Sequence, residues 1–494
     1  MRRCGAHAHK SLRYETITPL ARHYERPTGA RQSHRCSRRL RASTTVRLLR
    51  SLRSLAMTRE GDFNGETEMI RTLRIGFLIL GASIANVGAG GVATAEEMLR
   101  LQPLVQEALA ANPEIRAEEG KWDAARERPP QEGSLDDPML NFEIENLPTR
   151  SFGFTQDDMT MKKLGISQTF PYFGKLSLRS EVAQREANAI GLAYRDKRNE
   201  IVRRVKEIFY ELYAIERSLE IVEENRELLK QFVKIAETKY SVGKGVQQDV
   251  LKAQVELSKL LDEQIRLEQS RQAAGAKLNA ILNRPSHTPL GRTEDVSMAE
   301  ETLTELAKLQ AKALENRPLL KGLQEEIERS KAANALARKR YFPDLTMSLG
   351  YAFREDSAIV RRSDFFSAGV SVNIPIYFRT KQDRQVAETS ALINSAREQY
   401  QAARNEVASM VKELVTDIEK GRKLIDLLET GLIPQARLSL DSAVSGYQVG
   451  KVDFLTLLDN RVTLFNFKKE YYRTMGEYQM SLARLEWVVG APVH

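Results

Sequence analysis

Cysteine is almost absent from this 494-residue sequence, and its two copies, Cys4 and Cys36, lie near the beginning. From residue 37 onward, the chain can therefore form no disulfide, no zinc–thiolate site and no lipid-bearing cysteine. Histidine is equally sparse in that part, where His287 and His494 are isolated and are interpreted as surface residues. A metal centre built from cysteine and histidine is thus excluded for most of the chain.

Long apolar runs are also missing after residue 95, so no membrane-spanning helix is predicted there. The shorter apolar run 75–87 follows two arginines and precedes Ala93-Thr94-Ala95. A basic flank, a short apolar core and an A-x-A sequence predict a secretory signal peptide over 69–95, cleaved before Glu96. A core helix would not need that flank or that cleavage sequence.

The basic charge of the sequence is confined to its first part. Residues 1–68 carry 15 basic side chains against six acidic ones, whereas 96–494 carry 58 against 60. The high isoelectric point therefore does not indicate nucleic-acid binding by the main body. We interpret 1–68 as an Arg-rich leader read through from upstream of the true start, at Met57 or Met69, with a genuine basic arm as the alternative.

The second half of the sequence repeats the first. Pro113 matches Pro318 at an offset of 205 residues, and Tyr240-Ser-Val-Gly-Lys matches Tyr447-Gln-Val-Gly-Lys at an offset of 207. One unit of about 200 residues therefore occurs twice, at 96–290 and at 302–494. A period of this length indicates a duplicated domain and not a short-period solenoid.

Each repeat contains two segments in which apolar and polar residues alternate. They cover 140–145 and 163–170 in the first repeat, and 345–353 and 366–374 in the second. Segments of roughly ten residues with one apolar face are typical of transmembrane barrel strands. A soluble hairpin with one buried face has the same pattern, so the strands alone leave both interpretations open.

Four strands cannot close a barrel, and an open sheet edge cannot face lipid. Strands that enter a membrane must therefore be pooled from several chains, and three chains would supply twelve. The charged inter-strand loops 147–158 and 354–364 would then lie in water. In such a barrel, the side chains expected to face lipid are Phe142, Leu349 and Val370, and those expected to face the lumen are Ser348 and Ser371.

Long helices follow the strand pairs. From about Lys175 to Thr238 the sequence has no proline, and apolar residues recur every three or four positions between Ile201 and Val222. This spacing is the heptad seam of a coiled coil, and it recurs over 407–432. Such a helix reaches roughly 95 Å, and a return helix of about 38 residues follows each Val-Gly-Lys. The repeated motif therefore marks the tips of two helical hairpins.

No motif for catalysis or for binding a cofactor is found. Gly243-Lys-Gly245 lacks the spacing and the Ser or Thr of a phosphate-binding loop, and no nucleophile motif or metal-spaced cluster occurs. We therefore predict neither enzymatic activity nor a cofactor. A periplasmic coiled-coil adaptor without a pore would account for the signal and the helices, but not for the strand pairs or the full-length duplication.

Together, these features resemble the TolC-like family of outer-membrane efflux proteins, over essentially all of 96–494. The resemblance rests on the duplicated helix–strand–strand–hairpin unit, on Pro171-Tyr-Phe after the second strand, and on the repeated Tyr-x-Val-Gly tip. Asp137-Pro-Met-Leu and Glu145-Asn-Leu-Pro are more similar to the heavy-metal (CusC/CzcC-like) subgroup. The implied fold is mainly α with a four-strand contribution to a β-barrel, in which three copies form a trimeric α/β tube.

The resemblance also implies a function. It is that of an outer-membrane channel with a long periplasmic tunnel, acting as the exit duct of a tripartite efflux system. The implied partners are two further copies of the chain, an inner-membrane pump, a periplasmic adaptor and outer-membrane lipid, with no nucleic acid. Metal ions or small toxic compounds are the implied cargo, and an exit duct for type I secretion is the alternative.

Finally, the resemblance implies that the hairpin tips close the channel entrance. Asp249 and Tyr447 match a linked pair between neighbouring hairpins, and Asp459 matches an aspartate of a carboxylate ring. Thr456 and Val452 stand where a second ring aspartate and a linking arginine would be, so we expect a differently built lock. The candidate entrance residues are Tyr240, Gly243, Asp249, Tyr447, Gly450, Asp453 and Asp459. For the aspartates among them, a solvated carboxylate on a helix face is the alternative.

Overall fold

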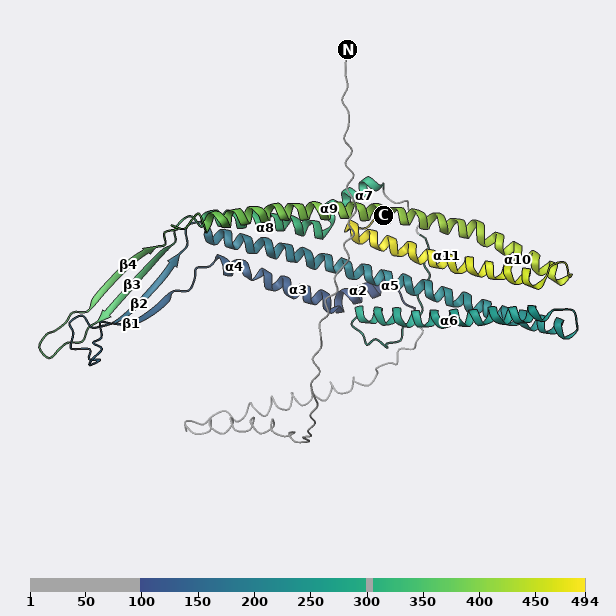
Figure 1. Cartoon of the computed structure of the whole chain (residues 1–494), viewed down its shortest axis with the longest axis horizontal. Coiled ribbons are helices and arrows are strands. Elements are labelled where there is room, and N and C mark those ends of the chain that lie inside the picture. Colours follow the sequence, from purple (N-terminus) through teal and green to yellow (C-terminus); the bar gives the residue numbers. More distant parts are fainter. Residues whose placement is uncertain (1–97, 299–304, 494) are drawn as a thin grey trace, which may run out of the picture. The chain divides into compact units, whose positions relative to one another are not determined.

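The computed structural model describes residues 98–298 and 305–493 (Figure 1). The leader predicted at 1–68 and the signal peptide predicted at 69–95 lie outside these residues. Within the described ranges, none of the helices combines the length and the apolar character needed to cross a bilayer.

The two repeats fold into the same succession of elements. The first repeat forms α2 (Leu101–Ala111), α3 (Pro113–Arg126), α4 (Arg128–Gly133), β1 (Met139–Glu145), β2 (Met161–Phe170), α5 (Lys175–Ser241) and α6 (Gln247–Ile281). The second forms α7 (Leu306–Asn316), α8 (Pro318–Lys339), β3 (Leu345–Phe353), β4 (Phe365–Val372), α9 (Gln382–Asp426), the π-helical turn η1 (Leu427–Leu432), α10 (Ile433–Gln448) and α11 (Phe454–Val489). The predicted mainly helical fold with a four-stranded sheet is confirmed.

Helix α5 is continuous over 67 residues, which gives it a length of about 100 Å. Its predicted apolar seam is buried, as Ile201, Val205 and Leu212 are each at most 2% exposed. The helix packs against α3 and α8 along one part and against α6 and α11 along the other (Figure 1). The seam itself packs on α2, α3 and α6, where Ile201, Val205 and Leu212 belong to one apolar cluster.

The matching helix of the second repeat is interrupted. Elements α9, η1 and α10 contain 45, 6 and 16 residues, the same total as α5, but η1 is a π-helical turn. Pro434, the second residue of α10, lies just after this turn and has no N–H to donate to the preceding turn of the helix. A wider π turn relieves the clash of the proline ring with the carbonyl four residues earlier. The heptad pattern over 407–432 did not predict this interruption.

The four strands form one antiparallel sheet in the order β1–β2–β3–β4. Side chains of directly paired residues lie on the same face. Apolar residues occupy one face, as in the paired row Phe142, Leu164, Tyr351 and Phe366. Polar and small residues occupy the other, as in the row Asn141, Gly165, Gly350 and Ser367. The predicted alternation therefore produces one two-faced sheet from both repeats.

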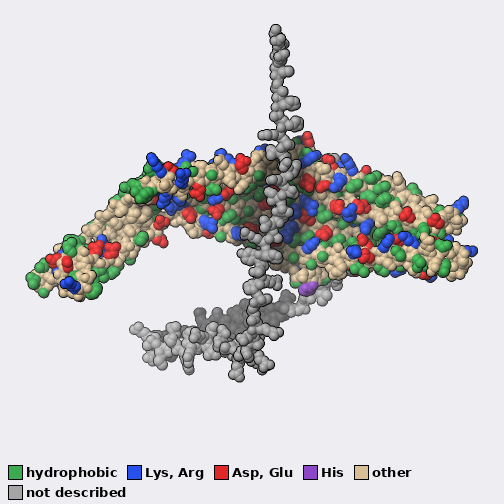
Figure 2. Space-filling view, viewed as in Figure 1, with side chains coloured by type: hydrophobic (Ala, Val, Ile, Leu, Met, Phe, Trp, Pro, Cys, Tyr) green, Lys and Arg blue, Asp and Glu red, His purple; other side chains and the backbone are tan. Residues whose placement is uncertain are grey.

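No other part of the described chain covers the apolar face of the sheet. Phe142, Leu349 and Val370 lie on it with 67%, 50% and 66% of their surface exposed. Ser348 and Ser371 lie on the opposite face. At the loop end of the sheet, where Figure 2 shows charged side chains gathered, Arg362 joins the two inter-strand loops through Asp158 at 2.6 Å. The sheet thus exposes an apolar face that ends at charged loops.

The main apolar clusters lie where the short helices pack on the long ones. In the first repeat, the cluster includes Leu104 of α2 and Phe209 of α5. In the second, it includes Leu320 of α8 and Leu485 of α11, both fully buried. One large cluster is therefore centred on each repeat, and two further clusters lie along the hairpins.

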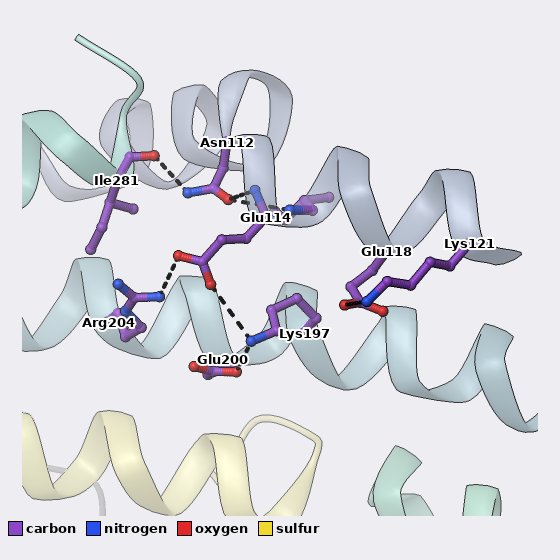
Figure 3. A network of polar contacts seen from close by, with 9 residues as sticks. Asn112, Glu114, Glu118, Lys121, Lys197, Glu200, Arg204 and Ile281 are labelled. Atoms are coloured by element: carbon purple, nitrogen blue, oxygen red, sulfur yellow. Dashed lines mark hydrogen bonds and ion pairs between the residues drawn. The ribbon is translucent and has the colours of Figure 1, made fainter. Parts of the chain in front are cut away.

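Polar side chains join the end of α6 to the start of α3 (Figure 3). The side-chain oxygen of Asn112 caps α3 by accepting hydrogen bonds from the N–H groups of Glu114 and Ile115, and its Nδ2 donates to the carbonyl of Ile281 at 2.8 Å. The matching junction in the second repeat has Arg317 in place of Asn112, and there the side chain makes no capping bond. The two junctions are therefore built differently.

Replacing Glu114 by glutamine is expected to remove a pH-dependent contribution to the stability of the α3–α5 contact. A hydrogen bond from Arg204, with the charges of Arg204 and Lys197, holds the pKa of Glu114 below its usual 4.5. The ionised carboxylate therefore stabilises the folded state above pH 4.5, and this contribution is lost as the pH falls through the lowered folded pKa. Thermal unfolding of wild type and Glu114→Gln should differ near neutral pH and converge in acid.

Glu118→Gln is the matched control for this experiment. Glu118 binds Lys121 within α3 at 2.7 Å and makes no hydrogen bond or ion pair to α5 among the described residues (Figure 3). Its replacement should change unfolding little at any pH, because exposed pairs within one helix contribute little. A difference between Glu114→Gln and wild type that stays constant down to the most acidic pH would contradict the prediction.

Candidate functional site

Both hairpin tips are built by the same backbone turn. Gly243 and Gly450 have φ angles of 73° and 74°, a left-handed conformation that other residues rarely adopt. The N–H of Lys244 donates to the carbonyl of Lys239, and that of Lys451 donates to the carbonyl of Gly446, each at 2.8 Å. These bonds close the C-terminal ends of α5 and α10 and turn the chain into α6 and α11. The two glycines are thus needed for the shape of the tips.

The two motif tyrosines have different surroundings. Tyr240 is 49% exposed. Tyr447 is half-buried, and its ring centroid lies 5.9 Å from that of Phe454 within an apolar cluster that also includes Phe232 of α5. Lys239 of α5 places its Nζ 3.6 Å from the centroid of the Tyr447 ring. Tyr447 therefore contacts the first hairpin from the second, whereas Tyr240 does not contribute to this contact.

The three candidate aspartates also differ. Asp453 caps α11 by accepting a hydrogen bond from the N–H of Thr456 at 2.7 Å, and this bond lowers the pKa of Asp453. Asp249 lies in the first turn of α6, where partial burial and the charge of Asp453 raise the pKa of Asp249 against the opposing effect of Lys239. Asp459 is exposed on α11. The structure thus brings Asp249, Asp453 and Lys239 close enough for their charges to interact, and Asp459 takes no part in this group among the described contacts.

The predicted link between Asp249 and Tyr447 is not formed within one chain. Among the described residues, the Tyr447 hydroxyl makes no hydrogen bond, and Asp249 accepts none from it. Lys239 interacts with both residues, since it contacts the Tyr447 ring and favours the ionised form of Asp249. Sequence reasoning missed Lys239, although the position precedes the repeated motif and is occupied by Gly446 in the second copy.

The described residues of the tips contain no cluster of metal-ligating side chains. In the described ranges, no three histidine, cysteine, aspartate or glutamate side chains are grouped so that they could hold a metal ion. The residues of the tips instead form contacts between hairpins, through the Tyr447 ring, the Lys239 cation and the apolar cluster around Phe454. Such an arrangement can hold two helical hairpins together or release them.

Comparison with known proteins gives consistent relatives. CzcC, the cobalt-zinc-cadmium resistance protein of Cupriavidus metallidurans, is 24% identical over 317 residues, which cover 64% of this chain and 74% of the relative. The outer membrane protein TolC of Vibrio cholerae is 20% identical over 420 residues, covering 82% and 94%. Both matches extend over most of the relative.

Solved structures share the fold. VceC of Vibrio cholerae superposes with a TM-score of 0.67 at 18% identity, over 80% of this chain and 97% of VceC. CusC superposes with a TM-score of 0.65 at 18% identity, over 81% and 94%. The model of the outer membrane efflux protein family matches residues 104–284 and 309–491, once in each repeat and over more than half of the chain. The chain therefore belongs to the outer membrane efflux protein family.

Proposed function

We propose that three copies of this outer-membrane efflux protein form an exit duct, which receives its cargo from an inner-membrane pump through a periplasmic adaptor. The protein is a channel and not an enzyme. The observation that carries the proposal is the two-faced sheet, whose apolar face is exposed and whose outer strands β1 and β4 each have one unpaired edge. In lipid these edges must be paired, and three copies supply a closed barrel of twelve strands.

The ends of the sheet fit the two surfaces of a membrane. Aromatic residues flank the apolar band of transmembrane barrels. Here Phe353 and Phe366 lie toward the loops, while Phe170 lies at the opposite end of the sheet. Near the loops, Lys162 shares the apolar face with Phe353 and pairs with Glu355 beyond the strand. An apolar face bounded in this way supports insertion with the loops outside the cell and the helices in the periplasm.

Divalent metal ions are the cargo class that we favour. The support is the similarity to CzcC, whose name assigns it to cobalt, zinc and cadmium resistance. A passive duct needs no metal site of its own, since the pump selects the cargo. The test is growth of a strain lacking this protein on cobalt, zinc and cadmium salts, with and without the gene restored. Equal growth of both strains would favour another cargo, including a secreted polypeptide.

The entrance of the duct is the second part of the proposal. Asp249 of one copy accepts a hydrogen bond from Tyr447 of the adjacent hairpin in the neighbouring copy, and Asp459 lines the same aperture. The Tyr447 hydroxyl has no acceptor among the described residues of its own chain, so it is available for this bond. A ring of aspartates would favour cations and resist full closure. Asp453, in contrast, is assigned to capping α11.

Removing the bond between Asp249 and Tyr447 is expected to increase the leak of purified trimers in planar bilayers. A tyrosine–carboxylate bond contributes about 1.5–3 kcal/mol when shielded, and about 1 kcal/mol at a partly wet site such as this one. Asp249→Ala, Tyr447→Phe and the double variant should each raise the single-channel conductance. The double variant should match the single ones, because both residues belong to one bond.

The control for this experiment is Tyr240→Phe, at the matching but exposed position of the first tip. It should conduct like wild type. If all variants including the double one conducted like wild type with trimers intact, the lock would have to lie elsewhere in the tips.

A further inference from the structure

The two tips differ at one pair of facing positions. In the second tip, Gly446 faces Val452, and a Cβ on the glycine would lie 2.5 Å from Cγ2 of that valine. The matching positions of the first tip are Lys239 and Gly245, and a Cβ on Gly245 would lie 3.1 Å from Cβ of Lys239. Each turn therefore has room for one side chain at this place. In the second tip this side chain is Val452, on the α11 side of the turn. In the first tip it is Lys239, at the end of α5.

This exchange gives the first tip a cation directed at the second. The Nζ atom of Lys239 lies 3.6 Å from the centroid of the Tyr447 ring, within the range of a cation–π contact. The same ring packs in an apolar cluster, with Phe454 at 5.9 Å between centroids. Lys239 is thus a charged group of the first hairpin that contacts Tyr447.

The same lysine also acts on the carboxylate of its own hairpin. Its charge favours the ionised form of Asp249, which the charge of Asp453 opposes. Lys239 therefore interacts with two groups, the Tyr447 ring of the second hairpin and the Asp249 carboxylate of its own hairpin. The position that resemblance assigns to a linking arginine is Val452, which has no charge.

We propose that Lys239 supplies, from the first hairpin, the cation that is absent at Val452 of the second hairpin. Its contact with the Tyr447 ring holds the two hairpins of each chain together in the closed entrance. Lys239 is a positioning residue, because it acts through Tyr447 and does not itself touch cargo. The inference rests on the proposed function. It assigns the face of the Tyr447 ring to Lys239 of the same chain and leaves the hydroxyl for Asp249 of the neighbouring copy.

The test compares Lys239→Met with Lys239→Arg as purified trimers in planar bilayers. Methionine keeps the apolar stem and removes the charge, whereas arginine keeps a cation that also stacks on aromatic rings. Loss of one cation–π contact at a partly exposed site such as this should shift the closed–open balance by at least about two- to fivefold. We expect a correspondingly higher leak for Lys239→Met and conductance close to wild type for Lys239→Arg, with unchanged trimer stability in both.

Two variants of Tyr447 separate the contribution of its aromatic ring from that of its hydroxyl. Phenylalanine retains a π face, so Lys239→Met should still raise the leak when it is added to Tyr447→Phe. Leucine has none, so Lys239→Met should add nothing to Tyr447→Leu. The pair Lys239→Gly with Gly245→Val gives the first tip the side-chain arrangement of the second and should leak like Lys239→Met.

The outcomes distinguish failure of the role assigned to Lys239 from failure of the proposed exit duct. If Lys239→Met and the Gly245→Val pair conduct like wild type while Tyr447→Leu leaks, the assignment of Lys239 is wrong and the duct remains. An equal effect of Lys239→Met in the leucine and phenylalanine backgrounds would also overturn it. If the wild-type protein yields no conducting trimer at all, the proposed function is wrong, whatever the role of Lys239.

Discussion

Arginine in place of Leu349 is expected to prevent the protein from assembling in the outer membrane. Leu349 occupies the middle of β3 on the apolar face, where it pairs with Ile166 and Ala368. An arginine at the midplane of a barrel's lipid-facing surface costs about 2–4 kcal/mol, and a trimer would contain three. Little assembled protein should therefore be recovered from outer-membrane fractions of cells that produce Leu349→Arg.

Ser348→Arg is the matched control, one residue away on the same strand. Ser348 lies on the polar face and pairs with Ser167 and Gly369, so an arginine there would extend into the lumen of the proposed trimeric barrel. This variant should assemble and alter conductance instead. Assembly is measured by the migration of unheated and heated samples in detergent gels. Normal assembly of Leu349→Arg together with failure of Ser348→Arg would show that the two faces are assigned the wrong way round.

Truncation of Leu320 is expected to have the second large effect. Leu320 of α8 is 0% exposed and belongs to the apolar cluster of the second repeat. Replacing a fully buried leucine by alanine removes its transfer energy and leaves a cavity, at a cost of about 2–5 kcal/mol. Thermal unfolding of detergent-purified Leu320→Ala should therefore occur well below the wild-type temperature.

The neighbouring Leu319 provides the comparison. It lies on the same helix and is 40% exposed, so Leu319→Ala removes less buried surface and leaves no closed cavity. We expect its effect to be about 1 kcal/mol or less. Similar losses of stability in the two variants would mean that the face of α8 that carries Leu319 is also packed, for example by a neighbouring copy.

Much of the fold follows from periodic patterns in the sequence. The heptad seam around Ile201 predicts α5 because a long run of one spacing leaves few alternatives. The alternation in 345–353 predicts β3 for the same reason, and the duplication predicts that β3 pairs with β4 as β1 pairs with β2. The pairing of β2 with β3, which joins the two repeats, was not predicted. These patterns are repeated twice in the chain, so each repeat supports the assignment of the other.

The features that sequence reasoning missed depend on single residues in tertiary contacts. Pro434 produces a π turn in one helix, and the pattern of apolar residues around it does not change. Arg317 and Asn112 occupy matching junctions, but only contacts with α6 reveal the role of the asparagine. Lys239 looks like an ordinary charged residue at a helix end, and its significance emerges only when the ring of Tyr447 is placed beside it.

The equal length of the two long helical spans has a consequence for how such tunnels can change. Both spans contain 67 residues and end 207 positions apart, so their turns fall at the same level. Inserting one heptad into α5 and α6 alone would move the first tip about 10 Å beyond the second and separate Lys239 from Tyr447. A longer or shorter tunnel therefore requires the same insertion or deletion in four helical segments at once. Tunnel length should accordingly vary between related proteins in coordinated steps and not by drift in single helices.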